Sequence, residues 1–375
     1  MAVRVCRWGI LSTATVGRKN WLAIRNTGNG SIAAVASRSK NSAQQFIHDC
    51  QAHWPIKPEP KAYGSYQELI DDPNIDAVYV PLPTGLRKEW VIRAAEAGKH
   101  VVCEKPCAPS SDDLREMIAA CERNKVQFMD GVMYMHSRRL GELRKAIDDE
   151  SSLGALKRIA MQFSFRAPPE FFSDNIRSDH RLEPQGCLGD LGWYTTRFAL
   201  WVVDYELPLR VVGRMLAANT QSSAEHPVPT EFSGELFFEG GVTASFYNSF
   251  QTHHQQWAQI SGTKCQLRVA DFVLPYFSNA ASFERVSCEF NPTGFDFNME
   301  PARHYVEVQE QSNGGQNSPE TNLFRTFGNL VLAGRPDPYW PNISLKTQVV
   351  LDALLLSARN GGEPVEVNRS TPSYV

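Results

Sequence analysis

Short apolar segments alternate with helical patterns through residues 1–135, and brief links join them. The apolar segments, which we predict as strands, cover residues 3–11, 32–36, 77–80, 100–102 and 126–129. The helical patterns between them cover residues 16–25, 42–50, 88–97 and 111–125. A strand that returns through a helix to its neighbour forms a parallel pair. The alternation therefore predicts a doubly wound α/β domain built on a parallel sheet.

The pattern changes after residue 135, where a polar-faced helix is predicted at residues 138–149. Longer segments of alternating polarity follow at residues 156–165, 210–217, 232–238, 242–250, 256–262 and 266–273, and two helices are predicted at residues 320–333 and 344–360. Such alternation is typical of antiparallel strands with one covered face. We therefore predict a second, α+β domain over residues 136–375, built on a large, open, mostly antiparallel sheet. Exposed loops are expected at residues 221–229 and 312–318.

Composition narrows the possible partners of this chain. Its 375 residues carry a formal net charge of −3, without the basic excess that nucleic acid requires. No apolar run approaches the roughly 20 residues that cross a bilayer, and the N-terminus lacks the apolar segment of a secretory signal. The eight cysteines include no Cys-x-x-Cys pair, and the nine histidines form no ligand-spaced cluster. We expect reduced thiols, a cytoplasmic location, and no metal site, nucleic acid or membrane partner.

The segment Cys103-Glu104-Lys105-Pro106 directly follows the predicted strand at residues 100–102. The carboxyl ends of parallel strands border the crevice in which doubly wound sheets bind ligands. A packed core has no use for Lys105 there, because burying an ammonium without a partner is costly. In isolation, Glu-Lys-Pro would be typical of a solvated loop. The sequence leaves open whether the Lys105-Pro106 bond is cis.

The turn after the first strand, from Gly9 to Gly17, is where a dinucleotide site needs small residues beside the pyrophosphate. The three positions of a G-x-G-x-x-G pattern fall on Ser12, Ala14 and Gly17, so small residues replace two of the glycines. The flanking strand and helix favour a dinucleotide site over a plain βα turn without a ligand. We predict cofactor contacts from Ser12, Thr13, Ala14 and Val16.

The end of the second strand bears on the choice of nucleotide. An NAD site has an acidic residue about 20 residues past the turn, where it binds the ribose hydroxyls. This chain has Ser37-Arg38-Ser39-Lys40 at that place. Arg38 can pair with a 2′-phosphate in a bidentate fashion, and Ser37 and Lys40 can add a hydrogen bond and a charge. We predict NADP in preference to NAD; the alternative is that Arg38 is a solvated charge or stacks on adenine.

A second motif, Gly189-Asp190-Leu191-Gly192-Trp193-Tyr194, opens a helix predicted to continue to Val203. Asp190 and Tyr194 are four residues apart and would share one helix face. Positive charge from Lys105 would lower the pKa of the Tyr194 phenol, and alcohol oxidation needs such a base near the substrate hydroxyl. Taken singly, Asp190 is better explained as a charge at a helix N-terminus and Tyr194 as a half-buried aromatic residue.

In combination these motifs resemble the glucose–fructose oxidoreductase/inositol dehydrogenase/rhizopine-catabolism (Gfo/Idh/MocA) family over nearly the whole chain. The resemblance is carried by residues 8–14, 76–80, 98–106 and 190–194. It implies an N-terminal Rossmann domain, a C-terminal open-sheet domain, and hydride transfer between NAD(P) and a sugar or polyol carbon. The tyrosine of the second motif is similar to that of the dihydrodiol and xylose dehydrogenases and the glucose–fructose enzyme, whereas inositol-type members have histidine.

The resemblance also implies roles for single residues. Lys105 matches the family's catalytic lysine, Tyr194 its acid/base and Asp190 its substrate-orienting carboxylate. Glu104 would hold the nicotinamide end or the lysine. Further contacts are predicted to the cofactor from Pro81, Leu82 and Thr84, and to the substrate from Arg177 and His180. Thr84 and Arg87 depart from the family, which usually has asparagine and, three residues later, histidine at these places.

We therefore hypothesise an NADP-dependent dehydrogenase that acts on a sugar, a sugar derivative or a cyclic diol. Tyr194 would take the hydroxyl proton, and Lys105 would stabilise the developing alkoxide. Two alternatives stay open. One is a closed-cycle enzyme that keeps NADP(H) bound, coupling two sugars or assisting glycoside cleavage. The other is a non-catalytic NADP(H) sensor, which a fold alone does not exclude.

We also predict a homodimer or higher homo-oligomer that forms through the second sheet. Apolar and aromatic positions for this contact are supplied by Ala244, Phe246, Tyr247, Phe250, Phe232 and Phe237. An apolar patch of this kind more often marks an interface than bare solvent. Members of the resembled family commonly dimerise in this way. The alternative is that the two late helices cover these side chains.

Overall fold

The computed structural model describes residues 4–369. Its first sheet has six parallel strands in the order β3-β2-β1-β4-β5-β6. The strands are β1 (Cys6–Leu11), β2 (Gly30–Ala36), β3 (Lys61–Tyr63), β4 (Ala77–Val80), β5 (His100–Cys103) and β6 (Phe128–Asp130). The strand order reverses between β1 and β4, so their carboxyl ends flank the point at which such sheets bind ligands.

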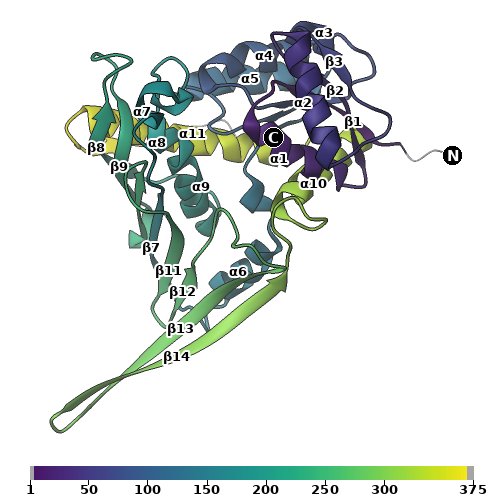
Figure 1. Cartoon of the computed structure of the whole chain (residues 1–375). Helices are drawn as coiled ribbons and strands as arrows, with labels where there is room; N and C mark the ends of the chain where they lie inside the picture. The colour runs from purple at the N-terminus through teal and green to yellow at the C-terminus, as the bar shows by residue number, and fades with distance from the viewer. Residues whose placement is uncertain (1–3, 370–375) are drawn as a thin grey trace.

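Helices connect these strands and pack on the sheet, as Figure 1 shows. They are α1 (Thr15–Arg25), α2 (Lys40–His53), α3 (Tyr66–Ile70), α4 (Thr84–Glu96) and α5 (Ser111–Arg123). A helix from the far end of the chain, α10 (Pro319–Ala333), also packs against α1 and β1. The Trp8 ring lies 5.2 Å from that of Phe324 and 5.3 Å from that of Phe327. The core of the first sheet is thus completed by a segment of the predicted second domain.

The second sheet has nine strands in the order β14-β13-β12-β11-β7-β10-β9-β8-β15. They are β7 (Leu156–Ser164), β8 (Arg210–Asn219), β9 (Val228–Phe237), β10 (Thr243–Ser249), β11 (Gln255–Gly262), β12 (Gln266–Val269), β13 (Ala280–Thr293), β14 (Asp296–Gln309) and β15 (Val365–Glu366). All neighbours are antiparallel except β7 and β10. The predicted fold, a parallel doubly wound sheet followed by a large, mostly antiparallel sheet, is confirmed.

The remaining helices belong to this second part. They are α6 (Arg138–Asp148), α7 (Phe171–Asp174), α8 (Gly186–Asp190), α9 (Gly192–Val202) and α11 (Tyr339–Arg359), with short 3₁₀ turns at Met133–His136, Ile176–Ser178 and Glu239–Gly241. Within residues 4–369, every helix is too short or too polar to cross a bilayer.

Helices α8, α9 and α11 cover one face of the second sheet, which we call the inner face. Helix α11 lies so close to β8 that a Cβ on Gly213 would come within 2.1 Å of the Leu354 carbonyl oxygen. Most of the predicted interface residues are buried on this side: Phe232, Ala244, Phe246 and Phe250. For these four, the interface prediction is wrong, because they are already buried within the protein, Phe250 against the rings of Phe165 and Phe171. Phe237 and Tyr247 lie half-buried on the opposite face, which we call the outer face.

Three further differences from the predicted elements concern the site and its surroundings. Helix α4 begins at Thr84, four residues before the predicted start at residue 88. The helix predicted from Gly189 is two helices with a break at Leu191, so Asp190 ends α8 and does not share one helix face with Tyr194. The long β13–β14 hairpin was not predicted, because its residues 280–309 lack a buried face over much of their length.

Candidate functional site

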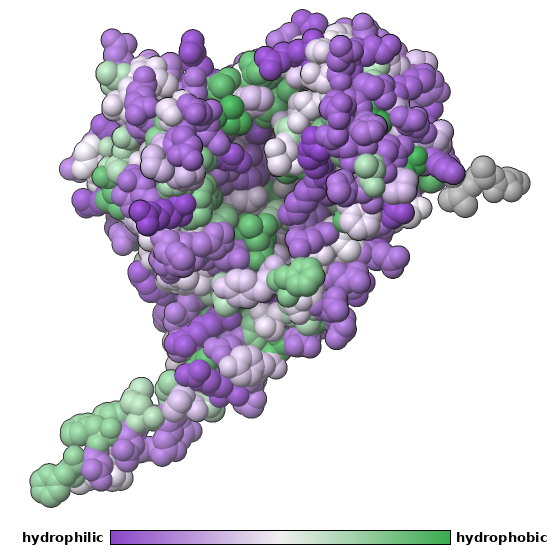
Figure 2. Space-filling view, viewed as in Figure 1, coloured by the Kyte–Doolittle hydropathy of each residue, from purple (hydrophilic) through white to green (hydrophobic). Residues whose placement is uncertain are grey.

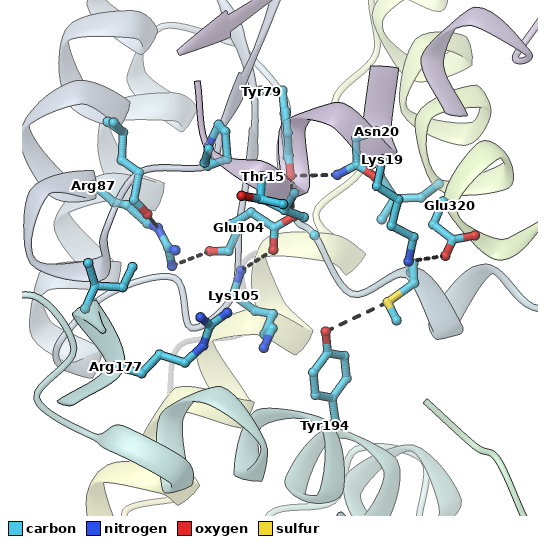
Figure 3. Close-up of a pocket in the computed structure, with 18 of the residues that line it drawn as sticks. Thr15, Lys19, Asn20, Tyr79, Arg87, Glu104, Lys105, Arg177, Tyr194 and Glu320 are labelled. Carbon is cyan, nitrogen blue, oxygen red and sulfur yellow. Dashed lines mark hydrogen bonds and ion pairs between the residues drawn. The ribbon is translucent and has the colours of Figure 1, made fainter. Parts of the chain in front are cut away.

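A cavity of about 520 Å³ lies between the carboxyl edge of the first sheet and helix α9 (Figure 3). The same hollow separates the two halves of the molecule in Figure 2. Its first wall, the cofactor wall, comprises the start of α1 and the segments that follow β4 and β5. Its second wall, the substrate wall, comprises the loop of residues 174–177 and Tyr194. Within residues 4–369, there is no group of three or more His, Cys, Asp or Glu side chains that could hold a metal ion.

The predicted dinucleotide turn forms the floor of the cofactor wall. Ser12, at the first glycine position, has a φ of 132°, in the region that favours glycine. Its Oγ accepts a hydrogen bond from the Ala14 N–H at 3.2 Å and donates to the Pro81 carbonyl at 3.3 Å. Ala14 precedes α1 without a side-chain cap, which leaves the N–H groups of the first turn available for an anion. Ala14 and Val16 line the cavity, whereas Ser12 and Thr13 are not part of its lining.

The three residues predicted to select the nucleotide lie one strand further out. Leu11 pairs with Ala36, so Ser37 and Arg38 emerge beside the dinucleotide turn. Ser37 is buried and donates its N–H to the Tyr63 carbonyl, while Arg38 and Lys40 are exposed. These side chains are not part of the cavity lining. They lie at the end of β2, where the ribose of a bound nucleotide is expected. Their role in selecting NADP over NAD stays a prediction.

Glu104 is held on the cofactor wall by a chain of short hydrogen bonds (Figure 3). Its Oε1 accepts from the Tyr79 hydroxyl at 2.6 Å, and that hydroxyl accepts from Asn20 Nδ2 at 2.6 Å. Its Oε2 accepts from the Lys105 N–H at 3.2 Å. The Lys105-Pro106 bond is cis. Glu104 is thus bonded to the backbone of the lysine, and its predicted role in holding the nicotinamide end or the lysine stays a prediction.

Lys105 reaches across the cavity to Asp190. Its Nζ donates to Asp190 Oδ1 at 2.6 Å and to the Asp190 carbonyl at 2.7 Å. Arg177 Nε donates to the other carboxylate oxygen at 2.8 Å. Burial favours the protonated acid, but the Arg177 and Lys105 charges outweigh it and lower the pKa of Asp190 to about 2. Asp190 is thus a permanent anion that fixes both cations, and its interpretation as a helix N-terminal charge is wrong.

Tyr194 lies beside Lys105, but its hydroxyl is not bonded to the ammonium. Lys105 Nζ lies 4.4 Å from the centre of the Tyr194 ring, and the hydroxyl lies 3.9 Å from Met133 Sδ. Burial, together with the negative charges of Glu104 and Asp190, raises the pKa of Tyr194 well above its usual value. The expected lowering of this pKa by Lys105 is therefore wrong, because burial and the two carboxylates outweigh a lysine charge that is paired with Asp190.

Thr84 and Arg87, the two departures from the resembled family, are both buried at the start of α4. Arg87 donates to the Leu82 carbonyl at 2.7 Å, to the Glu104 carbonyl at 2.8 Å and to the Pro106 carbonyl. Thr84 Oγ1 donates to Glu183 Oε2 at 2.5 Å. Pro81, Leu82 and Arg87 line the cavity, whereas Thr84 lies behind its wall. Thr84 is thus a link to the substrate loop, and its predicted contact with the cofactor is not supported by this position.

Glu183 was not predicted from the sequence. It is fully buried, and its Oε1 has no hydrogen-bond partner. Burial raises the pKa of Glu183 to about 7, against the opposing effect of Arg87. The loop that carries it rests on α4, where the Gly85 N–H donates to the Leu182 carbonyl at 3.0 Å. A Cβ on Gly85 would lie 2.0 Å from the Arg181 carbonyl oxygen, so this approach requires glycine.

The two predicted substrate residues lie in different places. Arg177 lines the cavity. His180 does not: its N–H donates to Ser222 Oγ at 3.1 Å, and its ring stacks on His226 with centroids 5.7 Å apart. The prediction for His180 is therefore not supported, because its loop turns the ring toward the segment before β9.

Other residues of the cavity come from distant parts of the chain. Lys19 Nζ lies 2.5 Å from Glu320 Oε1, which joins α1 to α10, and Leu323 and Phe324 line the same side. No local sequence pattern identifies this ion pair, because Lys19 and Glu320 are about 300 residues apart in sequence. Tyr79 did carry a signal, since a phenol in a fully buried strand needs a hydrogen-bond partner.

The two walls are joined below the cavity by a buried ion pair. Arg197 of α9 and Asp130 of β6 lie 2.6 Å apart, with side-chain exposures of 0% and 1%. The Trp193 indole N–H also donates to Asp130, at 3.0 Å. Because Trp193 and Tyr194 are adjacent, this contact sets the position of the phenol relative to the first sheet.

Known proteins that resemble this chain identify its family. Residues 6–132 match the model of an oxidoreductase family with an NAD-binding Rossmann fold, and residues 141–268 match the GFO/IDH/MocA C-terminal domain. A D-xylose 1-dehydrogenase (NADP(+)) of Haloferax volcanii is 34% identical over 263 residues, or 69% of this chain and 74% of that protein. The chain belongs to the Gfo/Idh/MocA oxidoreductase family. The predicted family and the prediction of an NAD(P)-dependent oxidoreductase are confirmed.

Other members of the Gfo/Idh/MocA family show the same likeness at lower identity. A trans-1,2-dihydrobenzene-1,2-diol dehydrogenase of Mus musculus is 28% identical over 273 residues, 72% of this chain and 76% of that protein. Among solved structures, an aldose–aldose oxidoreductase of Caulobacter crescentus superposes with a TM-score of 0.78 at 21% identity, covering 97% and 100% of the two chains. A 3-ketoreductase of Actinomadura kijaniata, in complex with NADP, gives 0.77 at 20% identity, covering 94% and 98%. These two likenesses show the shared fold.

Proposed function

We propose that this protein is an NADP-dependent dehydrogenase that transfers a hydride between the nicotinamide and a hydroxyl-bearing carbon of an aldose or a cyclic diol. The observation that carries the proposal is that Lys105, Arg177 and Tyr194 line one cavity beside the dinucleotide turn, while Asp190, outside the lining of that cavity, binds both Lys105 and Arg177. The names of the xylose and dihydrodiol dehydrogenases support the substrate class. Both kinds of compound offer neighbouring hydroxyl groups that a charged, hydrogen-bonding pocket can orient.

The start of α1 and the basic residues at the end of β2 fit NADP. The uncapped start of α1 suits the pyrophosphate, and the basic residues Arg38 and Lys40 suit a 2′-phosphate better than a ribose hydroxyl. The D-xylose relative is named for NADP, and the 3-ketoreductase structure contains it. When bound, the nicotinamide supplies the hydride acceptor or donor.

The side chains of the substrate wall supply the proton chemistry. Lys105 presents an ammonium, held by Asp190, that stabilises negative charge on the reacting oxygen. Tyr194 carries a neutral phenol, since its pKa is raised, and exchanges the proton with that oxygen. A phenol that holds its proton at neutral pH is suited to protonating a carbonyl oxygen in reduction. Oxidation of the alcohol then gains rate as the pH rises and the phenol ionises.

The test is to follow NADP⁺ reduction by absorbance across a panel of aldoses, polyols, sugar acids and cyclic diols, with Tyr194→Phe assayed in parallel. We expect turnover with aldoses or cyclic diols, increasing toward alkaline pH, and its loss in Tyr194→Phe. Silence across the panel in protein that binds NADP would contradict the proposal. Nucleotide that survives dialysis of such a silent protein would favour a closed-cycle enzyme over a sensor.

A further inference from the structure

Three arginine side chains are buried in the part of the chain that the structure describes, and they differ in what compensates their charge. Arg139 lies 2.5 Å from Asp271, and Arg197 lies 2.6 Å from Asp130. Arg87 is 6% exposed, and no carboxylate of the described chain forms an ion pair with it. Burying a guanidinium group without an anion is costly. Because Arg87 lies on the wall of the cavity, a ligand in the cavity can supply that anion.

The hydrogen bonds of Arg87 leave part of its guanidinium group available. Its Nε donates to the Leu82 carbonyl, and its Nη1 donates to the carbonyls of Glu104 and Pro106. These carbonyls fix the side chain beside Lys105 but carry no net charge. The other terminal nitrogen, Nη2, has two N–H groups and no acceptor among the described residues. Arg87 is thus a cation in a fixed position that still has donors for a ligand.

The carboxyl group of Glu183 interacts with the charge of Arg87 but does not pair with it. Its Oε2 accepts from Thr84, and its Oε1 has no partner. Burial raises the pKa of Glu183 to about 7, against the opposing effect of Arg87. At neutral pH about half of the molecules therefore carry a neutral acid at this position. The charge of Arg87 is then only partly compensated within the protein.

Arg177 brings a second guanidinium group to the same end of the cavity. Its Nε donates to Asp190, and its side chain is 40% exposed. In Figure 3 the ends of Arg87 and Arg177 point toward the same part of the cavity, next to Lys105. Asp190 is shared between Lys105 and Arg177. Three cations therefore stand against one permanent anion at this end.

The other carboxylates that line the cavity do not balance this charge. Glu320 pairs with a lysine of α1, on the side where α1 meets α10. The Glu104 carboxylate turns toward Tyr79, while its backbone carbonyl meets Arg87 (Figure 3). Asp174 is exposed, so water and salt screen its charge. Positive charge is thus concentrated at one end of the cavity.

We propose that Arg87 and Arg177 bind an acidic group of the substrate, which makes the substrate an aldose that carries a carboxylate or a phosphate. Guanidinium groups bind such anions through paired, charge-assisted hydrogen bonds. Lys105 and Arg177 hold the two oxygens of one carboxylate, that of Asp190, so the reacting hydroxyl and the acidic group fit on a single sugar ring. Arg87 stands where the resembled family usually has histidine, so this feature is the chain's own. The inference rests on the function proposed above and narrows its substrate.

The first test compares the binding of matched neutral and acidic sugars to the NADPH complex by calorimetry. The pairs are D-glucose with D-glucuronate and D-galactose with D-galacturonate, and the two hexose 6-phosphates form the phosphate arm. Ring-closed sugars offer NADPH no carbonyl to reduce, so binding is read without turnover. We expect one acidic sugar to bind about tenfold or more tightly than its neutral partner, as charge-assisted hydrogen bonds allow. Preference for a uronate assigns a carboxylate, and preference for a hexose phosphate assigns a phosphate.

Arg87→Gln and Arg177→Gln should each reduce this preference to below about threefold, because each removes one half of the anion site. The matched control is Arg181→Gln, which removes an arginine from the same loop whose side chain is 77% exposed, and which should keep the preference. If Arg87→Gln does not fold, Arg177→Gln decides. Equal affinities of the wild type for all pairs, or an unchanged preference in Arg177→Gln, would overturn the proposal.

Two further outcomes separate this inference from its neighbours. Loss of NADPH affinity in Arg87→Gln, with the acid preference intact, would assign Arg87 to the cofactor and overturn the proposal. Failure of the proposed function is a different result, since it requires that no sugar of the panel, neutral or acidic, is turned over with NADP⁺. An acid preference that persists in such a silent protein would support the anion site alone.

The second test uses Glu183, whose ionisation gives Arg87 a counter-ion within the protein. The groups that face Glu183 are Thr84 and Arg87 of α4, Asp190 of α8, and Arg177. The pKa of Asp190 is about 2, so Glu183 is the carboxyl group of this set that titrates near pH 7. We expect the acid preference of the wild type to fall by about threefold from pH 6 to pH 8, and that of Glu183→Gln to stay constant. A wild-type preference that does not change with pH would contradict the partial compensation of Arg87 and count against the site.

Discussion

The two walls of the cavity are built on different physical principles. The cofactor wall consists largely of backbone turns at the ends of adjacent parallel strands, where neutral hydrogen-bond donors hold Glu104. An ion pair also joins Lys19 on this wall to Glu320. The substrate wall consists of charges, in which Asp190 holds Lys105 and Arg177 together. The first wall is set by sheet geometry and the second by long-range ion pairs. Changes to the backbone turns and their hydrogen-bonded side chains should therefore alter nucleotide affinity, whereas changes to the ionic set of Lys105, Asp190 and Arg177 should alter turnover.

Lys105→Met is the strongest test of this separation, because Lys105 is the one member of the ionic set that the cofactor wall contributes. Loss of the ammonium removes the charge that stabilises the reacting oxygen, and we expect kcat to fall by about 10³-fold or more. Asp190 keeps Arg177, so the loop remains charge-compensated and NADP binding should change little. The measurements are kcat on the substrate found in the panel and the fluorescence-detected Kd for NADP(H). A near-normal kcat would refute the assigned role, and a lost Kd would break the separation of the walls.

Arg197→Met tests the buried ion pair between Arg197 and Asp130, which joins the two walls. It leaves the buried Asp130 carboxylate with Trp193 as its remaining partner, and a broken buried pair costs about 3–5 kcal/mol. We expect the free energy of unfolding, measured with denaturant, to fall by that amount. The double variant Asp130→Leu/Arg197→Met should recover much of the loss, because neither charge is then stranded. A loss below about 1 kcal/mol in the single variant would show that the pair is not the main link.

The cofactor wall was largely predictable from the sequence, because its residues lie next in sequence to the strands that position them. The turn residues and Glu104-Lys105 follow directly on the strands that position them, so a strand pattern is enough to place them. Ala14 and Lys105 do line the cavity, while their contacts with the cofactor stay predictions. The fold itself was predictable for the same reason, since alternating strands and helices determine a parallel sheet.

The substrate wall was only partly predictable, because its geometry depends on contacts between distant segments. The motif around Asp190 suggested a continuous helix, but the break at Leu191 turns Asp190 toward Lys105. The family resemblance implied substrate contacts for both Arg177 and His180, although the loop between them directs only Arg177 into the cavity. Glu183 and Glu320 had no local signal, since their partners Thr84 and Lys19 lie about 100 and 300 residues away.

Glu183 sharpens the comparison within the substrate wall, because it is a buried carboxylate without the two cations that hold Asp190. Burial raises its folded pKa to about 7, above an unfolded value near 4.3. Between these pH values the folded state binds the extra proton, so stability falls as the pH rises through this window. Glu183→Gln cannot ionise, and relative to wild type it should gain about 2–3 kcal/mol from pH 4.5 to 7.5 and nothing more above that.

The measurement for Glu183 is denaturant unfolding of both proteins across this pH range. Asp190→Asn is the matched contrast: the Asp190 pKa is already about 2, so this variant should show no change in relative stability over the same window. A flat difference between Glu183→Gln and wild type would mean that Glu183 keeps its charge at low pH. Its carboxylate would then resemble that of Asp190, and the contrast between the two would fail.

Arg38→Ala gives the smallest effect and tests the predicted nucleotide contact at the end of β2, outside the lining of the cavity. Arg38 is exposed at the end of β2, where water and salt screen its charge, so we expect a loss of roughly tenfold in NADP affinity. Affinity for NAD should be unchanged, because NAD has no 2′-phosphate for the guanidinium to bind. The control Arg25→Ala removes an exposed arginine at the far end of α1 and should alter neither affinity. Equal losses for both nucleotides would point to stacking on adenine, and a change in kcat at saturating NADP would show that the two walls do not act separately.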